Sequence, residues 1–167
     1  MIFLLTQFIL AMFATAGFSV IFRVPAKRIP ACVIIGALGW VAYEISMHYY
    51  SSPTLGCFIG ACVVGLLSNY AARLLKDPAT IFIIPGILCL VPGSAIFNTM
   101  ASTLDEDFSD AAQIGLQTLA MAGAIALGLL TIGAVLRVIY ALVRKTVNLS
   151  ELFAASERAR QRARRNR

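Results

Sequence analysis

The chain has few charged residues and little of the side-chain chemistry that an enzyme needs. Only 13% of its 167 residues are charged, whereas a soluble domain carries about 25%. It has one histidine, and it contains no nucleophile elbow, no zinc-binding histidine pair and no phosphate-binding loop. The sequence therefore predicts no enzymatic activity and no bound cofactor.

Metal-binding and disulfide patterns are missing as well. The four cysteines lie in apolar runs without the spacing of a zinc site: Cys32, Cys57, Cys62 and Cys89. We interpret them as small buried hydrophobic side chains rather than as a disulfide framework. The net charge of +6 would suit a nucleic-acid partner, but the positions of the basic residues favour another explanation.

What the chain does have is long apolar runs, five of them. Hydrophobic residues make up 59% of the sequence, and about 20 apolar residues are enough to cross a bilayer. We expect an all-α membrane protein with a five-helix transmembrane domain over residues 1–145 and a basic cytoplasmic tail over residues 146–167. The predicted spans are Met1–Phe22, Ala31–Tyr50, Thr54–Ala72, Ala79–Thr103 and Ala111–Leu136.

The basic residues all fall on one side of such a membrane domain. The 14 lysines and arginines lie within residues 23–28, within residues 73–76, or from Arg137 onward, and the acidic loop Leu104–Asp110 lies on the opposite side. Short loops rich in lysine and arginine stay in the cytoplasm. This distribution predicts an N-terminus outside and a C-terminus inside.

The fourth apolar run is interrupted by two Pro-Gly pairs, Pro85-Gly86 and Pro92-Gly93. Proline removes a backbone donor, and glycine lets the chain leave helical geometry. Broken backbone survives in a membrane only inside protein or beside a wet cavity, and it marks the binding sites of many transporters. We predict a fourth helix broken at these pairs; a proline-kinked structural helix is the alternative.

The predicted break supplies a candidate substrate site. A half-helix beginning near Ser94 would offer free amides and a positive dipole end to a carboxylate, and Asn98 and Thr99 would add polar contacts. Carbonyl groups released near Pro85 could accept from an ammonium group. The candidate substrate-binding residues are Pro85, Gly86, Pro92, Gly93, Ser94 and Asn98.

A second candidate site lies in the second span. Glu44 is the only acidic residue within a predicted span, and His48 follows one helical turn later on the same face. A carboxylate and an imidazole so placed could carry a proton. The alternative is a wetted, inert pair at the interface, which Tyr49 and Tyr50 favour for His48.

The sequence resembles the small-subunit type of the threonine/serine exporter family, which corresponds to the C-terminal half of the fused ten-helix exporters. The resemblance covers about residues 3–145, and its most specific part is Ile84–Phe97, with the core Leu-Val-Pro-Gly at residues 90–93. The basic loop Phe22–Arg28 is similar to the first loop of the family. Cys89 departs from the pattern, because many relatives have proline there.

The resemblance implies one subunit of a two-component, proton-driven exporter in the bacterial inner membrane, with a larger five-helix partner of the same family. Its substrate would be threonine or serine; a dicarboxylate such as succinate is the alternative, as is a non-transporting membrane assembly protein. The small residues Gly56 and Gly60, and those at 120, 124 and 128, are candidate surfaces for the partner.

Overall fold

The computed structural model describes residues 2–104 and 108–165, with side chains for residues 3–104 and 108–142. Every element in these ranges is an α-helix: α1 (Ile2–Ile21), α2 (Ile29–Tyr50), α3 (Pro53–Leu75), α4 (Thr80–Leu88), α5 (Gly93–Leu104) and α6 (Phe108–Arg165). The chain divides into two compact units, residues 1–132 and residues 133–167. The first unit holds α1 to α5 and the start of α6, and the second holds the remainder of α6.

The predicted membrane architecture is confirmed in its main features. Four helices are long and apolar enough to cross a membrane among the described residues, namely α1, α2, α3 and the part of α6 over Phe108–Leu142. The pair α4 and α5, bent by 49° at a short break, supplies the fifth candidate span. The inside and outside assignment of the loops stays a prediction.

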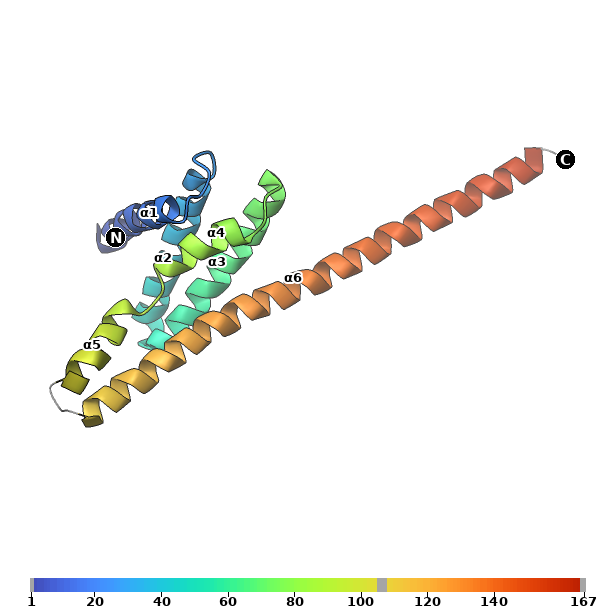
Figure 1. Ribbon diagram of the computed structural model, residues 1–167. Helices are drawn as coiled ribbons and strands as arrows, with labels where there is room; N and C mark the ends of the chain where they lie inside the picture. Colours follow the sequence, from blue (N-terminus) through green and yellow to red (C-terminus); the bar gives the residue numbers. More distant parts are fainter. Residues whose placement is uncertain (1, 105–107, 166–167) are drawn as a thin grey trace. The chain divides into compact units, whose positions relative to one another are not determined.

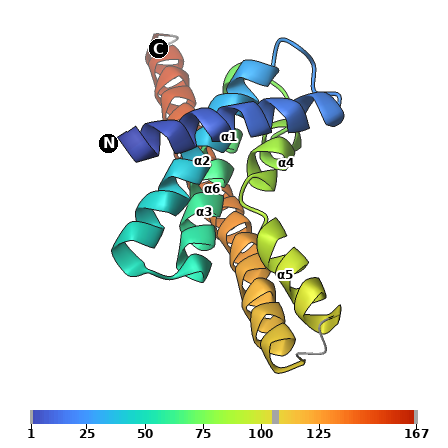
Figure 2. The same ribbon diagram turned by 90° about the vertical axis from the view of Figure 1, so that its left-hand side faces the viewer.

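Helix α2 is the central element of the first unit. It contacts α1, α3 and α4, which lie beside it or across it (Figures 1 and 2). Proline lies in the first turn of both α2 and α3, where its missing N–H would have no helical partner anyway. Both helices end at a residue in the left-handed conformation, Ser51 and Lys76, whose N–H returns to a carbonyl four residues earlier.

The small residues of α3 and α6 allow helices of this chain to approach one another. A methyl group at Gly60 would lie 3.0 Å from the carbonyl oxygen of Gly39 on α2, and one at Gly56 would lie 2.8 Å from the ring of Tyr43. On α6, a methyl group at Gly128 would lie 2.8 Å from the carbonyl oxygen of Phe58. Our expectation that these small residues face a partner is therefore wrong at Gly56, Gly60 and Gly128, because helices of the same chain already pack against them.

An ion pair joins the two basic loops at one end of the first unit. The guanidinium group of Arg28 contacts the carboxylate of Asp77 and also donates to the carbonyl oxygen of Leu75 at 2.9 Å. The loop before α2 and the loop before α4 thus meet, as expected for two loops on the same side of a membrane.

The structure describes the predicted acidic loop and the predicted C-terminal tail only in part. Residues 105–107 of the predicted acidic loop lie outside the described residues, while Leu104 ends α5 and Asp110 lies in the first turn of α6. The predicted tail begins at residue 146, yet the backbone of α6 stays helical to Arg165. The cytoplasmic location of that segment stays a prediction.

Candidate functional site

The break between α4 and α5 occupies Cys89–Pro92. Pro92 has no N–H to donate to the carbonyl of Leu88, and the N–H of Val91 reaches that oxygen instead, at 3.3 Å. The N–H of Leu90 donates to Ile87 across a turn of the same length, and that of Gly93 donates to Val91 across a shorter one, each at 2.8 Å. The predicted break therefore exists, and the second Pro-Gly pair lies at its downstream edge.

The first Pro-Gly pair does not interrupt the helix. Pro85 and Gly86 lie inside α4 and are buried. Pro85 cannot donate to the carbonyl of Ile81, four residues earlier, but the thiol of Cys32 on α2 donates to that oxygen at 3.5 Å. Our expectation of a break here is corrected for this reason: a neighbouring helix replaces the missing donor, so the helix continues. The Ile81 carbonyl is accordingly already bonded to protein rather than reserved for a substrate ammonium group.

Other thiols also contact this region. Cys57 on α3 points its sulfur toward the carbonyl oxygen of Leu90, at 4.0 Å, and the sulfur of Cys89 lies 3.0 Å from the hydroxyl of Thr15 on α1. The hydroxyl of Thr15 donates to the carbonyl of Ala11 at 2.8 Å, and the thiol of Cys89 donates toward the same carbonyl oxygen at 3.9 Å. The four cysteines are free, as expected, but their thiols also donate to backbone carbonyls of neighbouring segments, two of them at the break, which the sequence analysis missed.

The structure separates the predicted substrate-binding residues. Pro85 and Gly86 are buried within the helix packing, and Pro92 is half-buried. Gly93, Ser94 and Asn98 are exposed on α5, a helix that has no buried residue. The first pair thus serves the packing of α4, whereas the residues of α5 remain available to a ligand or to another protein.

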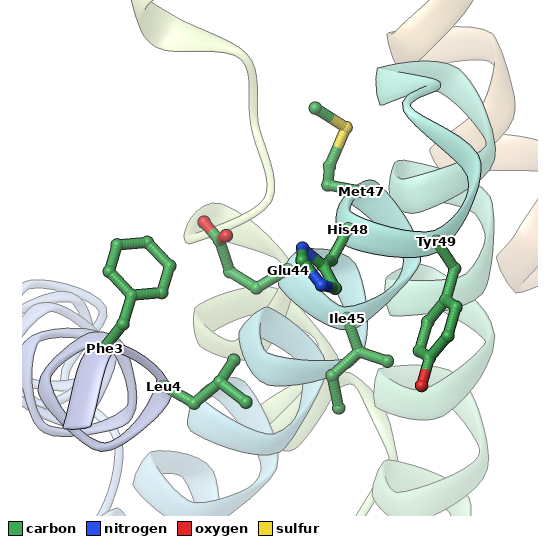
Figure 3. Close-up of a pocket in the computed structure, with 7 residues that line it drawn as sticks. All are labelled: Phe3, Leu4, Glu44, Ile45, Met47, His48 and Tyr49. Atoms are coloured by element: carbon green, nitrogen blue, oxygen red, sulfur yellow. The ribbon is translucent and has the colours of Figure 1, made fainter. Parts of the chain in front are cut away.

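Glu44 and His48 come together, as the sequence predicts, and line one open pocket of about 660 Å³ (Figure 3). The pocket lies between the C-terminal half of α2 and the beginning of α1. Glu44 is half-buried and directs its carboxylate toward the space beside Phe3, while the imidazole of His48 is exposed and packs edge-on against Tyr49. The structure thus places a carboxylate and an imidazole on one wall of this open pocket.

A smaller pocket of about 280 Å³ lies beside the break. Sequence reasoning missed it, because its walls come from three separate segments. The indole N–H of Trp40 donates to the side-chain oxygen of Gln7 at 3.1 Å, and Gln7 is the only side-chain amide in the first apolar run, a signal that could have drawn attention to it. The lining residues are Gln7, Leu10, Ala11, Ala14, Phe18, Trp40, Leu88 and Cys89.

Several apolar helices long enough to cross a membrane, together with one candidate span that is discontinuous, are typical of membrane transporters. The comparison with known proteins gives the particular family: residues 7–135 match the family described as "Threonine/Serine exporter, ThrE". The match covers most of the chain, and the chain belongs to this family.

Two relatives extend the comparison. The chain is 30% identical to an uncharacterized protein of Haemophilus influenzae over 115 residues, which are 66% of this chain and 38% of that protein. It is 33% identical to pheromone-regulated membrane protein 10 of Eremothecium gossypii over 90 residues, which are 53% of this chain and 12% of that protein. The chain thus spans well under half the length of either relative. No solved structure matches it.

Proposed function

We propose that this chain is one subunit of a two-component secondary exporter in the bacterial inner membrane, and that it moves small carboxylate metabolites, threonine and serine first, out of the cell. Membership of the exporter family over residues 7–135 carries the proposal. The break at Cys89–Pro92 supports it, because discontinuous helices place free backbone groups where transporters bind their substrates.

The partner is a larger membrane protein of the same family that supplies another five helices. The relatives are much longer than this chain, which covers 38% of one and 12% of the other. Helix α5 supports this part of the proposal: none of its residues is buried, and Ile96, Phe97 and Met100 are all exposed. A partner helix against α5 would also enclose Ser94 and Asn98, which are exposed in the chain by itself.

The substrate carboxylate binds at the start of α5, where the amides of Ser94 and Ala95 and the hydroxyl of Ser94 can donate to it. Proton coupling is assigned to Glu44, with His48 beside it in the same pocket. The half-buried position of Glu44 supports this role, since an intramembrane carboxylate is rarely retained without a function.

A dicarboxylate such as succinate is the alternative substrate. It would need two positive groups, and this chain has no lysine or arginine between residues 29 and 72 or between residues 79 and 136. A partner subunit would have to supply them. The further alternative, a non-transporting assembly protein, requires that the break serve folding alone.

Export from cells separates these functions. Cells that express the chain alone, the partner alone or both are fed a dipeptide containing threonine or serine, and the released amino acid is measured; succinate release under anaerobic growth is measured in parallel. We expect amino-acid export only with both subunits. Export of succinate alone would establish the alternative substrate, and no export of either from cells containing both proteins at normal membrane levels would refute transport.

A substitution at the start of α5 tests whether export depends on the break. Ser94→Leu should abolish export without lowering the amount of protein in the membrane, because it removes the hydroxyl at the start of α5 and fills the space in front of the amides. Ser109→Leu, at an exposed position near the start of α6, is the matched control and should export normally. Equal export by the two variants would show that the substrate carboxylate does not bind at the start of α5.

A further inference from the structure

A third pocket, which we call the loop pocket, lies between the loop after α1 and the beginning of α4. It has a volume of about 240 Å³ and is lined by residues 22–25 and by Thr80, Ile81, Ile84 and Pro85. Both segments belong to or follow loops whose basic residues predict a cytoplasmic location. We therefore expect this pocket at the level where the lipid headgroups of the cytoplasmic leaflet meet the hydrocarbon.

Arg23 gives the loop pocket a positive charge, which the two pockets described above do not have. The side chain of Arg23 is exposed, and no carboxylate pairs with it among the residues whose side chains the structure describes. Arg28 in the same loop differs, because it contacts the carboxylate of Asp77. The guanidinium group of Arg23 is therefore available to an anion from outside the chain, and its planar set of donors suits a phosphate group.

The turn that carries Arg23 is held together by backbone hydrogen bonds. The N–H of Arg23 donates to the carbonyl of Val20, and the N–H of the next residue donates to the carbonyl of Ser19, each at 3.0 Å. Arg23 itself has the left-handed conformation, with φ 53°, as expected for this kind of helix end. Glycine suits such a position better than arginine does, so the turn does not need the Arg23 side chain.

The remainder of the wall is mostly apolar. Phe22 and Ile84 are 48% and 44% exposed, Ile81 is half-buried and Pro85 is buried. Thr80, the first residue of α4, adds an exposed hydroxyl group. A free anion would leave this apolar surface uncovered, whereas a molecule with an anionic head and an apolar tail would cover it.

We propose that the loop pocket binds one anionic phospholipid of the cytoplasmic leaflet. The lipid phosphate contacts the guanidinium group of Arg23 and the hydroxyl of Thr80, and the beginning of an acyl chain packs against Phe22 and Ile84. Basic pockets at the cytoplasmic ends of membrane helices are suited to acidic headgroups. The pocket is smaller than a whole phospholipid, so the rest of the lipid lies along the exposed apolar side chains of the spans. Such a lipid would join the end of α1 to the start of α4, whichever substrate the exporter carries.

Binding of single lipid molecules to the purified protein tests the proposal. The full chain is kept in a neutral detergent, where no anionic membrane surface attracts its basic loops, and native mass spectrometry counts the lipids bound per chain. Phosphatidylglycerol is compared with phosphatidylethanolamine of identical acyl chains, and we expect tighter binding of the first, because the second has no net charge. Excess inorganic phosphate should not displace phosphatidylglycerol, since free phosphate gains nothing from the apolar wall.

Matched loop variants test the contact with Arg23. Arg23→Gln should weaken the binding of phosphatidylglycerol about tenfold, the factor expected for the loss of one charge-assisted hydrogen bond. Lys27→Gln removes an equal charge from an exposed position of the same loop that does not line the pocket, and it should bind normally. Arg23→Gly should lose the lipid as Arg23→Gln does, yet its melting temperature should not fall, because glycine favours the turn.

Three results would overturn the proposal. Equal weakening by Lys27→Gln and Arg23→Gln would show a general attraction to the basic loop rather than a site. Equal binding of phosphatidylethanolamine and phosphatidylglycerol would show that the anionic charge is not recognised. Displacement of phosphatidylglycerol by inorganic phosphate would show that the pocket takes a free phosphate group instead of a lipid.

Discussion

Replacing Cys32 with alanine tests how the chain keeps α4 helical through its internal proline. The Cys32 side chain is completely buried, and its thiol donates to the carbonyl of Ile81. That carbonyl is the one whose helical donor Pro85 removes. If the thiol substitutes for the missing N–H, Cys32→Ala should be less harmful once Pro85→Ala has restored the N–H.

The expected size of the effect follows from the contact. A thiol is a weak donor, and hydrogen bonds measured inside membrane bundles average about 0.6 kcal/mol. Cys32→Ala should destabilise the protein by about 1–2 kcal/mol, which combines the lost bond with the small cavity left by the sulfur atom. In the Pro85→Ala background the cavity part remains and the bond part disappears, so the coupling energy should be about 0.5–1 kcal/mol.

Unfolding in detergent can be followed by the fluorescence of Trp40, the only tryptophan of the chain. The four proteins of the cycle are compared under identical conditions, and Cys32→Ser serves as a control that keeps a donor at the same place. Serine should lose less stability than alanine does. If Cys32→Ala destabilises the protein equally with and without Pro85, the thiol does not replace the missing N–H and the reasoning is refuted.

Three further predictions concern packing, the loops and proton coupling. Gly128→Ala should lower stability by about 1–3 kcal/mol because its methyl group would lie 2.8 Å from a backbone oxygen, whereas Gly123→Ala, with no atom within 4 Å, should have no measurable effect; similar melting temperatures would contradict this contact. Arg28→Ala should destabilise by about 0.5–1 kcal/mol, since the ion pair is partly exposed, and exchanging the two residues as Arg28→Asp with Asp77→Arg should recover part of the loss; a swap as unstable as Arg28→Asp by itself would argue against the pair. Glu44→Gln should stop export at an unchanged membrane level while Glu44→Asp retains some, and normal export by the glutamine variant would remove Glu44 from the coupling step.

The sequence was a sufficient guide to the spans. Hydropathy is a property of consecutive residues, so apolar runs such as Ala31–Tyr50 predict membrane helices without knowledge of what they contact. The loss of a backbone donor at Pro85 and at Pro92 was predictable for a similar reason, because proline lacks its N–H in every environment. The pairing of Glu44 with His48 in one pocket follows from helical periodicity alone.

Only the tertiary structure decided how the polar groups of this membrane domain are satisfied. Pro85 and Pro92 look equivalent in the sequence. A thiol from α2 replaces the missing donor at Pro85, where the helix continues, whereas the helix is interrupted just before Pro92. The small pocket was hidden for the same reason, since Gln7 and Cys89 lie 82 residues apart in the chain and meet only through packing. A hydrogen bond between distant segments depends on which helices lie side by side, and local composition carries no information about that.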